Sequence, residues 1–346
     1  MNASIMWFRQ DLRLSDNPAL TAALESSRTV IPLFVLPQLS GHAWSIGEAG
    51  RWWLNESLQT LSRDINELGS RLIIRRGNPG EVLTEIARQY SVTDIYSNEV
   101  YEPGERTEDK KVAAVLEQQG ITIHRHHGNL LLAPELVKNK SNAPYRVFTP
   151  FYRYYVHNGY ATQLAERPDQ LPPVPGDIGS VASDLLELLP TNSWYQKLDN
   201  YWEPGENGVV KSLAELTENK LAGYPDNRDI PSQSGTSRLS PHLHFGEVSP
   251  RQVIDRLDSL ASQSTYPGIS KGRESLLRQL VWRDFACHIL HHFPHTANKP
   301  FNADYERFPW QQTDSKLLAA WQSGNTGIPI IDAGMRELWE TGWMHN

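Results

Sequence analysis

The chain has 346 residues, of which 39% are hydrophobic and 21% are charged, and this size and composition allow two domains with filled cores. Its formal net charge of -7 argues against a protein that coats nucleic acid nonspecifically, although a local basic groove is compatible with it. The single cysteine, Cys287, excludes an internal disulfide, and its apolar neighbours predict an inert buried thiol. The first residues do not resemble a signal peptide and no apolar run is long enough to span a bilayer, so we expect a cytoplasmic protein.

Short apolar runs alternate with amphipathic segments over the first part of the chain. Strands are expected at residues 5–8, 30–35, 72–74, 94–96 and 121–124, and helices between them at 17–26, 47–68, 79–90 and 103–119. This alternation predicts right-handed crossovers and a mostly parallel, doubly wound sheet. Neither a glycine-rich dinucleotide fingerprint nor a phosphate-loop lysine motif follows any of these strands, so the α/β domain is not an ordinary NAD or ATP binder.

Arg9, Asp11 and Arg13 alternate directly after the first predicted strand. Opposite charges at this spacing favour a salt-bridged network between the layers of the fold. We therefore interpret them as structural.

Prolines interrupt the pattern from about residue 158 to residue 200, which favours a long linker on the surface. Helices are expected after it at 208–224, 249–261, 272–291, 315–322 and 329–340. The sequence thus predicts an α/β domain over 1–150, a linker over 151–205 and an all-helical domain over 206–346.

A hydroxyl-rich loop lies within the predicted helical domain. It consists of Gly235, Thr236, Ser237, Arg238, Leu239 and Ser240, and a proline follows. Rotatable hydroxyl donors and the fixed fork of an arginine suit a pyrophosphate. The alternative is a serine-rich loop that leads into a helix, and the loop taken alone favours this alternative.

Polar and flat side chains border the apolar stripe of the helix expected at 272–291. Gln279 and Trp282 are three residues apart and share a face, with Arg278 and Arg283 beside them. A flat indole next to an amide suits stacking on a nucleobase and hydrogen bonding to its edge. Packing of Trp282 into the core is the alternative, and the sequence does not decide between them.

Two groups of histidines raise the question of a metal site. The first contains His242 and His244, and the second contains His291, His292 and His295. Further ligands are not found at the spacing of a metal site. Structural hydrogen bonding is favoured for both groups, and no metal is predicted.

Several segments, in order along nearly the whole chain, resemble the DNA photolyase and cryptochrome family. The first is Trp-Phe-Arg-Gln-Asp-Leu-Arg at 7–13, which Asp-Asn-Pro follows at 16–18. The others are Pro-Tyr-Arg-Val-Phe-Thr-Pro-Phe at 144–151, the loop at 235–240, Leu-Val-Trp-Arg-Asp-Phe at 280–285 and the segment 324–346, which ends in Thr-Gly-Trp-Met-His-Asn. Each match alone is weak, whereas their order and extent make the resemblance specific.

The resemblance implies a deoxyribodipyrimidine photo-lyase, most similar to the bacterial enzymes that repair cyclobutane pyrimidine dimers by electron transfer from light-excited, reduced FAD. It implies FAD in the helical domain, an antenna pigment between the domains (methenyltetrahydrofolate or 8-hydroxy-5-deazaflavin), ultraviolet-damaged DNA as the partner, and a monomer. The alternative is a cryptochrome, a blue-light photoreceptor that signals through protein partners.

The same resemblance assigns roles to residues by their position. Those that would hold the flavin are Tyr224, Thr236, Ser237, Arg238, Leu239, Ser240 and Arg283. Gln279, Trp282 and Asn346 would be the catalytic, DNA-binding residues lining the cavity that receives the flipped-out lesion, since photolyases are known base-flipping enzymes. Arg228 would contact the DNA backbone, and Trp310 would be the surface end of a tryptophan electron relay.

Two features depart from the family's pattern. Dimer-repair enzymes usually carry glutamate where this chain has Gln279. Glutamine is more typical of the branch that repairs (6-4) photoproducts, but that branch carries a catalytic histidine where this chain has Asn346, so the cyclobutane dimer remains the favoured lesion.

The second departure is that the family continues past residue 346, with further FAD contacts and two inner relay tryptophans. We therefore expect an incomplete flavin site, apolar helix faces without cover and protein that purifies without flavin. The α/β domain up to Phe151 is expected to survive as a protease-resistant core because its pattern is complete.

Overall fold

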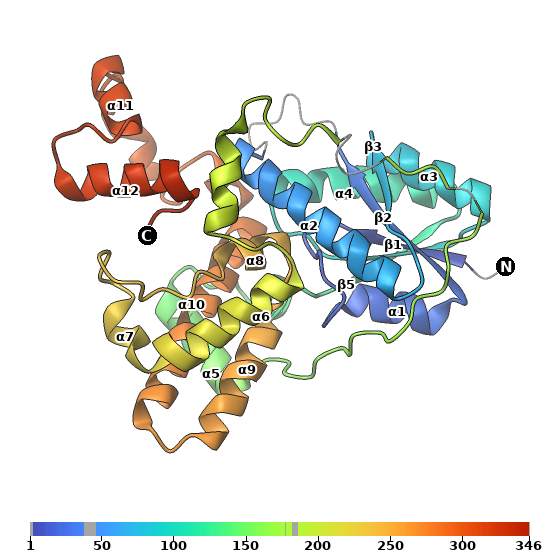
Figure 1. Ribbon diagram of the computed structural model, residues 1–346, viewed down its shortest axis with the longest axis horizontal. Coiled ribbons are helices and arrows are strands. Elements are labelled where there is room, and N and C mark those ends of the chain that lie inside the picture. The colour runs from blue at the N-terminus through green and yellow to red at the C-terminus, as the bar shows by residue number, and fades with distance from the viewer. Residues whose placement is uncertain (1–2, 38–45, 177, 182–185, 346) are drawn as a thin grey trace.

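The computed structural model describes residues 3–37, 46–176, 178–181 and 186–345. Its first part is a parallel five-stranded sheet with the strand order β3-β2-β1-β4-β5 (Figure 1). The strands are β1 (Ala3–Phe8), β2 (Thr29–Leu36), β3 (Ile73–Arg76), β4 (Asp94–Asn98) and β5 (Thr122–His126). The predicted doubly wound sheet is therefore confirmed.

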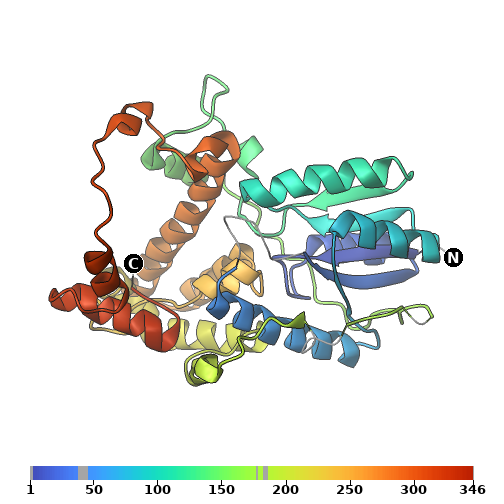
Figure 2. The ribbon, with the colours of Figure 1, turned by 90° about the horizontal axis from the view of Figure 1, so that it is seen from above.

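Helices cover both faces of the sheet (Figure 2). They are α1 (Pro18–Ser26), α2 (Glu48–Glu67), α3 (Pro79–Tyr90) and α4 (Pro103–Glu117). Met6 and Phe8 of β1 belong to the core cluster on the side of α1 and α2, whereas Ile5 and Trp7 pack with residues of α3 and α4. Burial on both sides explains why β1, apart from Ser4, is apolar and does not alternate.

Side-chain caps define where two of these helices begin. The Asn17 side chain accepts a hydrogen bond from Leu20 N at the start of α1, and Asn78 accepts from Gly80 N at the start of α3. A proline follows each asparagine, at a position where its missing N–H costs nothing. These caps place the starts of α1 and α3 where the sequence predicts them.

The segment predicted to be a surface linker contributes to the core. It includes most of α5 (Phe148–Asn158), the described residues between 159 and 192, and a 3-10 helix, Ser193–Asn200. Its buried apolar side chains are Leu171, Leu186, Leu188 and Leu198 in the cluster on the side of α2, and Ile178 in the cluster on the side of α3. The prediction of a purely surface segment is therefore wrong. Prolines prevent the regular spacing of apolar residues that marks a buried helix or strand, but the leucines of an irregular segment can still pack into the core.

The part of the chain after residue 205 is helical, with loops between the helices. They are α6 (Glu206–Glu215), a π-helical turn (Leu216–Lys220), a 3-10 turn (Leu221–Gly223), α7 (Tyr224–Asn227), α8 (Ser240–Phe245), α9 (Pro250–Gln263), α10 (Pro267–His292), two 3-10 turns (Pro294–Ala297 and Ala303–Arg307), α11 (Ser315–Gln322) and α12 (Pro329–Thr341). The single helix predicted over 208–224 is wrong, since Gly223 and Pro225 disfavour a continuous α-helical ladder there. The long helix α10 begins at Pro267, before the predicted start at residue 272.

Arg13 joins the sheet to the helical part. Its side chain is fully buried and donates to the backbone oxygens of Asp16 (2.9 Å), Gly128 (2.7 Å) and Gly246 (2.8 Å). Arg9 pairs with Asp109 of α4 at 2.5 Å, and the backbone N of Arg9 donates to Asp11. The predicted salt-bridged network is confirmed for Arg9 only, because the buried Arg13 binds backbone oxygens instead of a carboxylate and so connects one part of the fold to the other.

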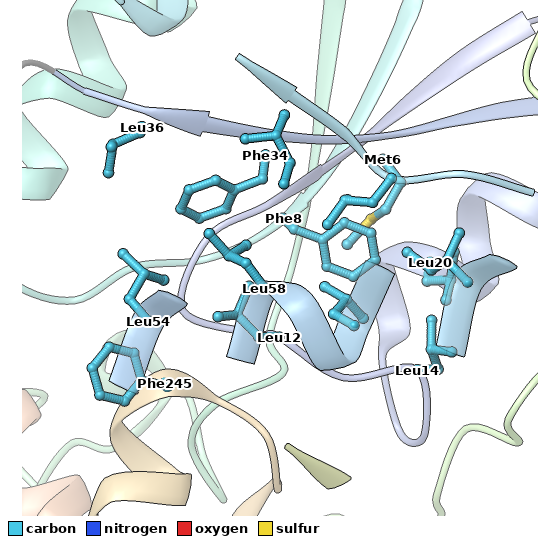
Figure 3. Close-up of a cluster of buried hydrophobic side chains, with 14 of the residues drawn as sticks. Met6, Phe8, Leu12, Leu14, Leu20, Phe34, Leu36, Leu54, Leu58 and Phe245 are labelled. Atoms are coloured by element: carbon cyan, nitrogen blue, oxygen red, sulfur yellow. The ribbon is translucent and has the colours of Figure 1, made fainter. Parts of the chain in front are cut away.

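A second set of contacts closes the same interface. Phe245 of α8 lies beside Leu54 of α2 in the cluster under the sheet (Figure 3). The buried carboxylate of Glu247 accepts hydrogen bonds from Trp53 Nε1 (3.0 Å) and Ser57 Oγ (2.5 Å) of α2. Thus α8 and the turn after it complete the core below α2.

Apolar side chains are exposed on α11 and α12, which lie at the edge of the molecule, away from the sheet (Figure 1). The side chain of Leu317 is 70% exposed and that of Ile330 is 67% exposed. The end of α12 contacts the 3-10 helix Ser193–Asn200 and the residues after it, where Trp202 Nε1 donates to Thr341 O at 2.6 Å. Within the described ranges, a helix with the length and apolar character needed to cross a membrane does not occur.

Candidate functional site

The hydroxyl-rich loop at 235–240 passes close to the end of α7. A Cβ atom on Gly235 would lie 2.3 Å from the backbone oxygen of Asn227, so only glycine allows this approach. Ser237 Oγ accepts a hydrogen bond from Leu239 N at 3.4 Å. The hydroxyls of Thr236 and Ser240 have no hydrogen-bond partner among the described residues and remain available to a ligand.

Arg238 has partners within the protein. Its guanidinium lies 4.6 Å from the ring centroid of Trp343 and 5.5 Å from that of Trp202, and it is 3.6 Å from Glu337. Its φ of +53° is a left-handed backbone conformation that is uncommon outside glycine. These contacts tie the loop to α12, so the expected bidentate contact with a pyrophosphate would require the guanidinium to leave them.

The last described residues return to this loop. His345 Nε2 lies 2.8 Å from the backbone oxygen of Arg228, and the Trp343 ring contacts Arg238. Tyr224 is buried at the start of α7, and burial raises its pKa, while the Arg228 guanidinium opposes that shift. Tyr224, Arg228 and Arg238 are thereby brought into one region.

Asn346, the remaining predicted residue of this region, lies outside the described residues. Arg228 itself forms an ion pair with Asp229 at 3.1 Å. The predicted contact of Arg228 with DNA stays a prediction.

One side of α10 faces the interior. Arg283 donates to the backbone oxygens of Asn129 (2.5 Å) and Leu243 (3.1 Å). The buried Asp284 accepts hydrogen bonds from two backbone N–H groups and from Tyr155 Oη at 2.9 Å, and burial raises its pKa to about 6. Arg283 thus links α10 to α8 and to the loop after β5, and its predicted place beside a flavin ring stays a prediction.

The predicted lesion-binding pair lies on α10 at the border of this buried side. The Trp282 side chain is 43% exposed and stacks on Phe148 of α5, with ring centroids 3.5 Å apart and ring planes 7° apart. Gln279 is half-buried, and its side-chain amide has no hydrogen-bond partner among the described residues. Trp282 is therefore not a core residue. Phe148 was not found from the sequence, although its spacing of four from Tyr152 was a usable signal.

Trp310 stands apart from these residues. Its side chain is 81% exposed, and its ring contacts Phe308 at a centroid distance of 4.7 Å. Within the described part of the chain, no hydrogen bond or ring contact joins Trp310 to α10 or to the loop at 235–240.

Both groups of histidines have structural partners. His242 Nδ1 lies 2.5 Å from the carboxylate of Glu247, and His292 Nε2 lies 3.0 Å from the backbone oxygen of Pro134. The sequence did not single out Glu247 because the left-handed turn at Gly246 brings it back to His242. In the described ranges, a group of three or more side chains that could hold a metal does not occur. Burial raises the pKa of Cys287 to about 11, as predicted for an inert thiol.

Family models match both parts of the chain. The model for DNA photolyase matches residues 4–172, and the model for the FAD binding domain of DNA photolyase matches residues 276–346. The first covers the sheet with its helices, and the second runs from within α10 to the last residue.

Individual relatives agree with these models. The deoxyribodipyrimidine photo-lyase of Agrobacterium fabrum is 37% identical over 99% of this chain and 70% of its own length. Cryptochrome-1 of Arabidopsis thaliana is 34% identical over 99% of this chain, which spans 51% of that protein. The crystal structure of a bacterial class III photolyase from Agrobacterium tumefaciens superimposes with a TM-score of 0.91 at 36% identity, over 100% of this chain and 70% of that one. This chain therefore belongs to the DNA photolyase family, which includes deoxyribodipyrimidine photo-lyases and cryptochromes.

Proposed function

We propose that this chain repairs cyclobutane pyrimidine dimers in DNA in a light-driven reaction. The observation that carries the proposal is the exposed indole of Trp282, stacked on Phe148 and next to the unpartnered amide of Gln279. Phe148 covers one face of the Trp282 indole, and the other face can stack on a flipped-out base. The Gln279 amide can then form hydrogen bonds to the edge of that base. The names of the bacterial relatives support this lesion as the substrate.

FAD in the helical part would supply the light-driven electron. The free hydroxyls of Thr236 and Ser240 fit the oxygens of its phosphates, and Tyr224, Ser237, Leu239 and Arg283 would surround other parts of it. The guanidinium of Arg238 does not fit this role where it stands, because two rings and a carboxylate hold it. We assign Arg238 the task of holding the loop in place.

The remaining assignments rest on the family pattern. Arg228 would contact the DNA backbone, Asn346 would line the lesion cavity, and Trp310 would be the outer end of the electron relay. The partner is ultraviolet-damaged DNA, and we propose that the protein acts as a monomer in the cytoplasm.

An antenna pigment, a folate or a deazaflavin, would bind between the two parts of the fold. Glu105 at the start of α4 is a candidate contact, since Gln10 donates to its Oε1 at 3.1 Å while Oε2 is buried without a partner among the described residues. Burial raises the pKa of Glu105 to about 7. Its unpartnered oxygen fits a ring N–H group of either pigment.

Replacement of Trp282 by alanine tests the base-stacking role. We expect W282A to weaken binding to dimer-containing DNA by about 1–3 kcal/mol, the range for loss of one base–aromatic stack, with little change in any flavin absorption. Titration of a labelled oligonucleotide measures the effect. W339A is the matched control, because Trp339 is also an exposed indole but lies on α12. Equal affinity of W282A and the parent for damaged DNA would remove Trp282 from the site.

Replacement of Gln279 by glutamate separates repair from signalling. A carboxylate accepts stronger, charge-assisted hydrogen bonds than an amide, so we expect Q279E to raise the number of dimers repaired per absorbed photon. The cryptochrome alternative is represented among the relatives by the Arabidopsis protein. Repair that falls or stays unchanged in Q279E would contradict our account of Gln279 and support a photoreceptor.

A further inference from the structure

Two helices bring an arginine and three aromatic rings together at the candidate lesion site, where Phe148 is buried and the arginine and Trp282 are exposed. Phe148 and Tyr152 lie one turn apart on α5, and Arg278 and Trp282 lie one turn apart on the neighbouring α10 (Figure 1). Trp282 stacks on Phe148. The guanidinium carbon of Arg278 lies 5.0 Å from the ring centroid of Phe148 and 5.0 Å from that of Tyr152. We call these four residues the aromatic–arginine cluster.

The position of the Arg278 guanidinium is defined by the two rings and not by a carboxylate. Arg278 is exposed, and its side chain makes neither a hydrogen bond nor an ion pair with a described residue. A guanidinium carries five N–H donors in a rigid plane, and contact with ring faces restricts that plane. The donors of Arg278 are therefore oriented without being used, which is the state expected of a preformed anion contact.

The charge around the cluster favours an anion as well. Helix α5 carries no acidic residue and contributes the exposed Arg153. On α10, Glu274 is an exposed acid one turn before Arg278, and Arg273 is already paired with Asp258 at 2.6 Å. This local surface is basic although the chain as a whole has a net charge of -7.

We propose that Arg278 binds a phosphodiester of the DNA whose base stacks on Trp282, and that Phe148 and Tyr152 hold its guanidinium for that contact. This inference rests on the proposed function, because it places the same DNA on Trp282. Residues four apart on a helix have Cβ atoms about 5–6 Å apart, so a single nucleotide can reach both side chains. Trp282 would bind the base and Arg278 the backbone, and together they would fix the strand along α10.

The salt dependence of DNA binding by the 346-residue chain tests the phosphate contact. We expect R278Q to bind dimer-containing duplex about tenfold more weakly than the parent, as for loss of one charge-assisted hydrogen bond. The slope of log K against log salt should become shallower by about 0.9, the value for one phosphate contact. R256Q is the matched control, since it removes the same charge from an exposed position on α9, and its slope should equal that of the parent. An unchanged slope in R278Q would overturn the contact.

Variants of Tyr152 test the role of the rings, because Tyr152 contacts Arg278 and leaves the stack of Trp282 on Phe148 in place. Y152L keeps every charge, so we expect the parental salt slope with affinity lowered about threefold through poorer orientation of the guanidinium. Y152F keeps a ring and should restore the affinity. Parental affinity in Y152L would overturn the positioning role.

Binding by the parent and by R278Q distinguishes failure of the proposed function from failure of the Arg278 contact. If the parent binds damaged and undamaged duplexes equally, the proposed function fails. If the parent prefers the damaged duplex and R278Q keeps the parental slope, only the assignment of Arg278 fails.

Discussion

Replacement of Arg13 by alanine is expected to remove about 5 kcal/mol or more of the free energy of unfolding. The buried guanidinium donates to three backbone oxygens and to Asn129 Oδ1, and alanine would leave these acceptors without their donor. Each buried acceptor left unsatisfied costs about 1–3 kcal/mol, and the cavity left by a large side chain adds to this. Because typical domains have only about 5–15 kcal/mol in total, R13A should be largely unfolded near physiological temperature.

Denaturant titration followed by tryptophan fluorescence measures this effect. R28A is the control, because Arg28 is an exposed arginine of the same part of the fold. We expect R28A to unfold at the parental midpoint, since exposed substitutions change stability by only about 0.5 kcal/mol. A similarly small effect of R13A would show that water replaces the guanidinium at the interface and that the two parts do not depend on Arg13.

The strands and the helices over the sheet could be predicted because their signals are local. Apolar runs mark strands buried on both faces, and the asparagine–proline pairs at residues 17–18 and 78–79 mark two helix starts. The segment at 159–192 could not be predicted in this way. Its leucines are buried by tertiary contacts with α2, which leave no period in the sequence. Which of its residues are buried depends on the elements that the segment contacts, and the local sequence does not contain that information.

The candidate site could be predicted only where its signals are local to one helix. The spacing of Gln279 and Trp282 along α10 showed that they share a face, and in the structure Trp282 is exposed and Gln279 half-buried. The sequence could not show that Phe148 supports Trp282, because they lie on different helices. Nor could it show that Arg238 is held by Trp202 and Trp343, which are distant along the chain. The residue types indicated base stacking and anion binding, whereas the side chains that hold Trp282 and Arg238 in place could be identified only from the fold.

Helix α10 combines the two requirements of a site, a fixed support and an accessible surface. Its inner side is held by Arg283 and Asp284, whose hydrogen bonds reach α8, α5 and the loop after β5. On the exposed part of the same helix, Arg278 and Trp282 present unused donors and an exposed ring. Side chains on a helix anchored in this way lose little further freedom when DNA binds, which favours affinity.

A fragment that ends at Phe151 is expected not to fold, contrary to the expectation from the sequence pattern alone. In the whole chain, the core of the sheet is closed by residues that such a fragment lacks, namely Leu171, Ile178, Leu186, Leu188, Leu198 and Phe245. Burial of each large apolar side chain contributes about 1.5–3 kcal/mol. Their loss removes on the order of 10 kcal/mol, which equals the whole stability of a typical domain.

Two fragments that differ only by the segment after α5 measure this contribution. A fragment of residues 1–205 retains all of these side chains except Phe245, and it should show partial protection from proteolysis, whereas residues 1–151 should be digested throughout and bind hydrophobic dyes. In the 346-residue chain, limited proteolysis should leave a resistant product that extends past Leu198, because cleavage before this residue opens the face of α2. If residues 1–151 unfolded in a single sharp thermal transition, the leucines of the following segment would cover a core that is already stable without them.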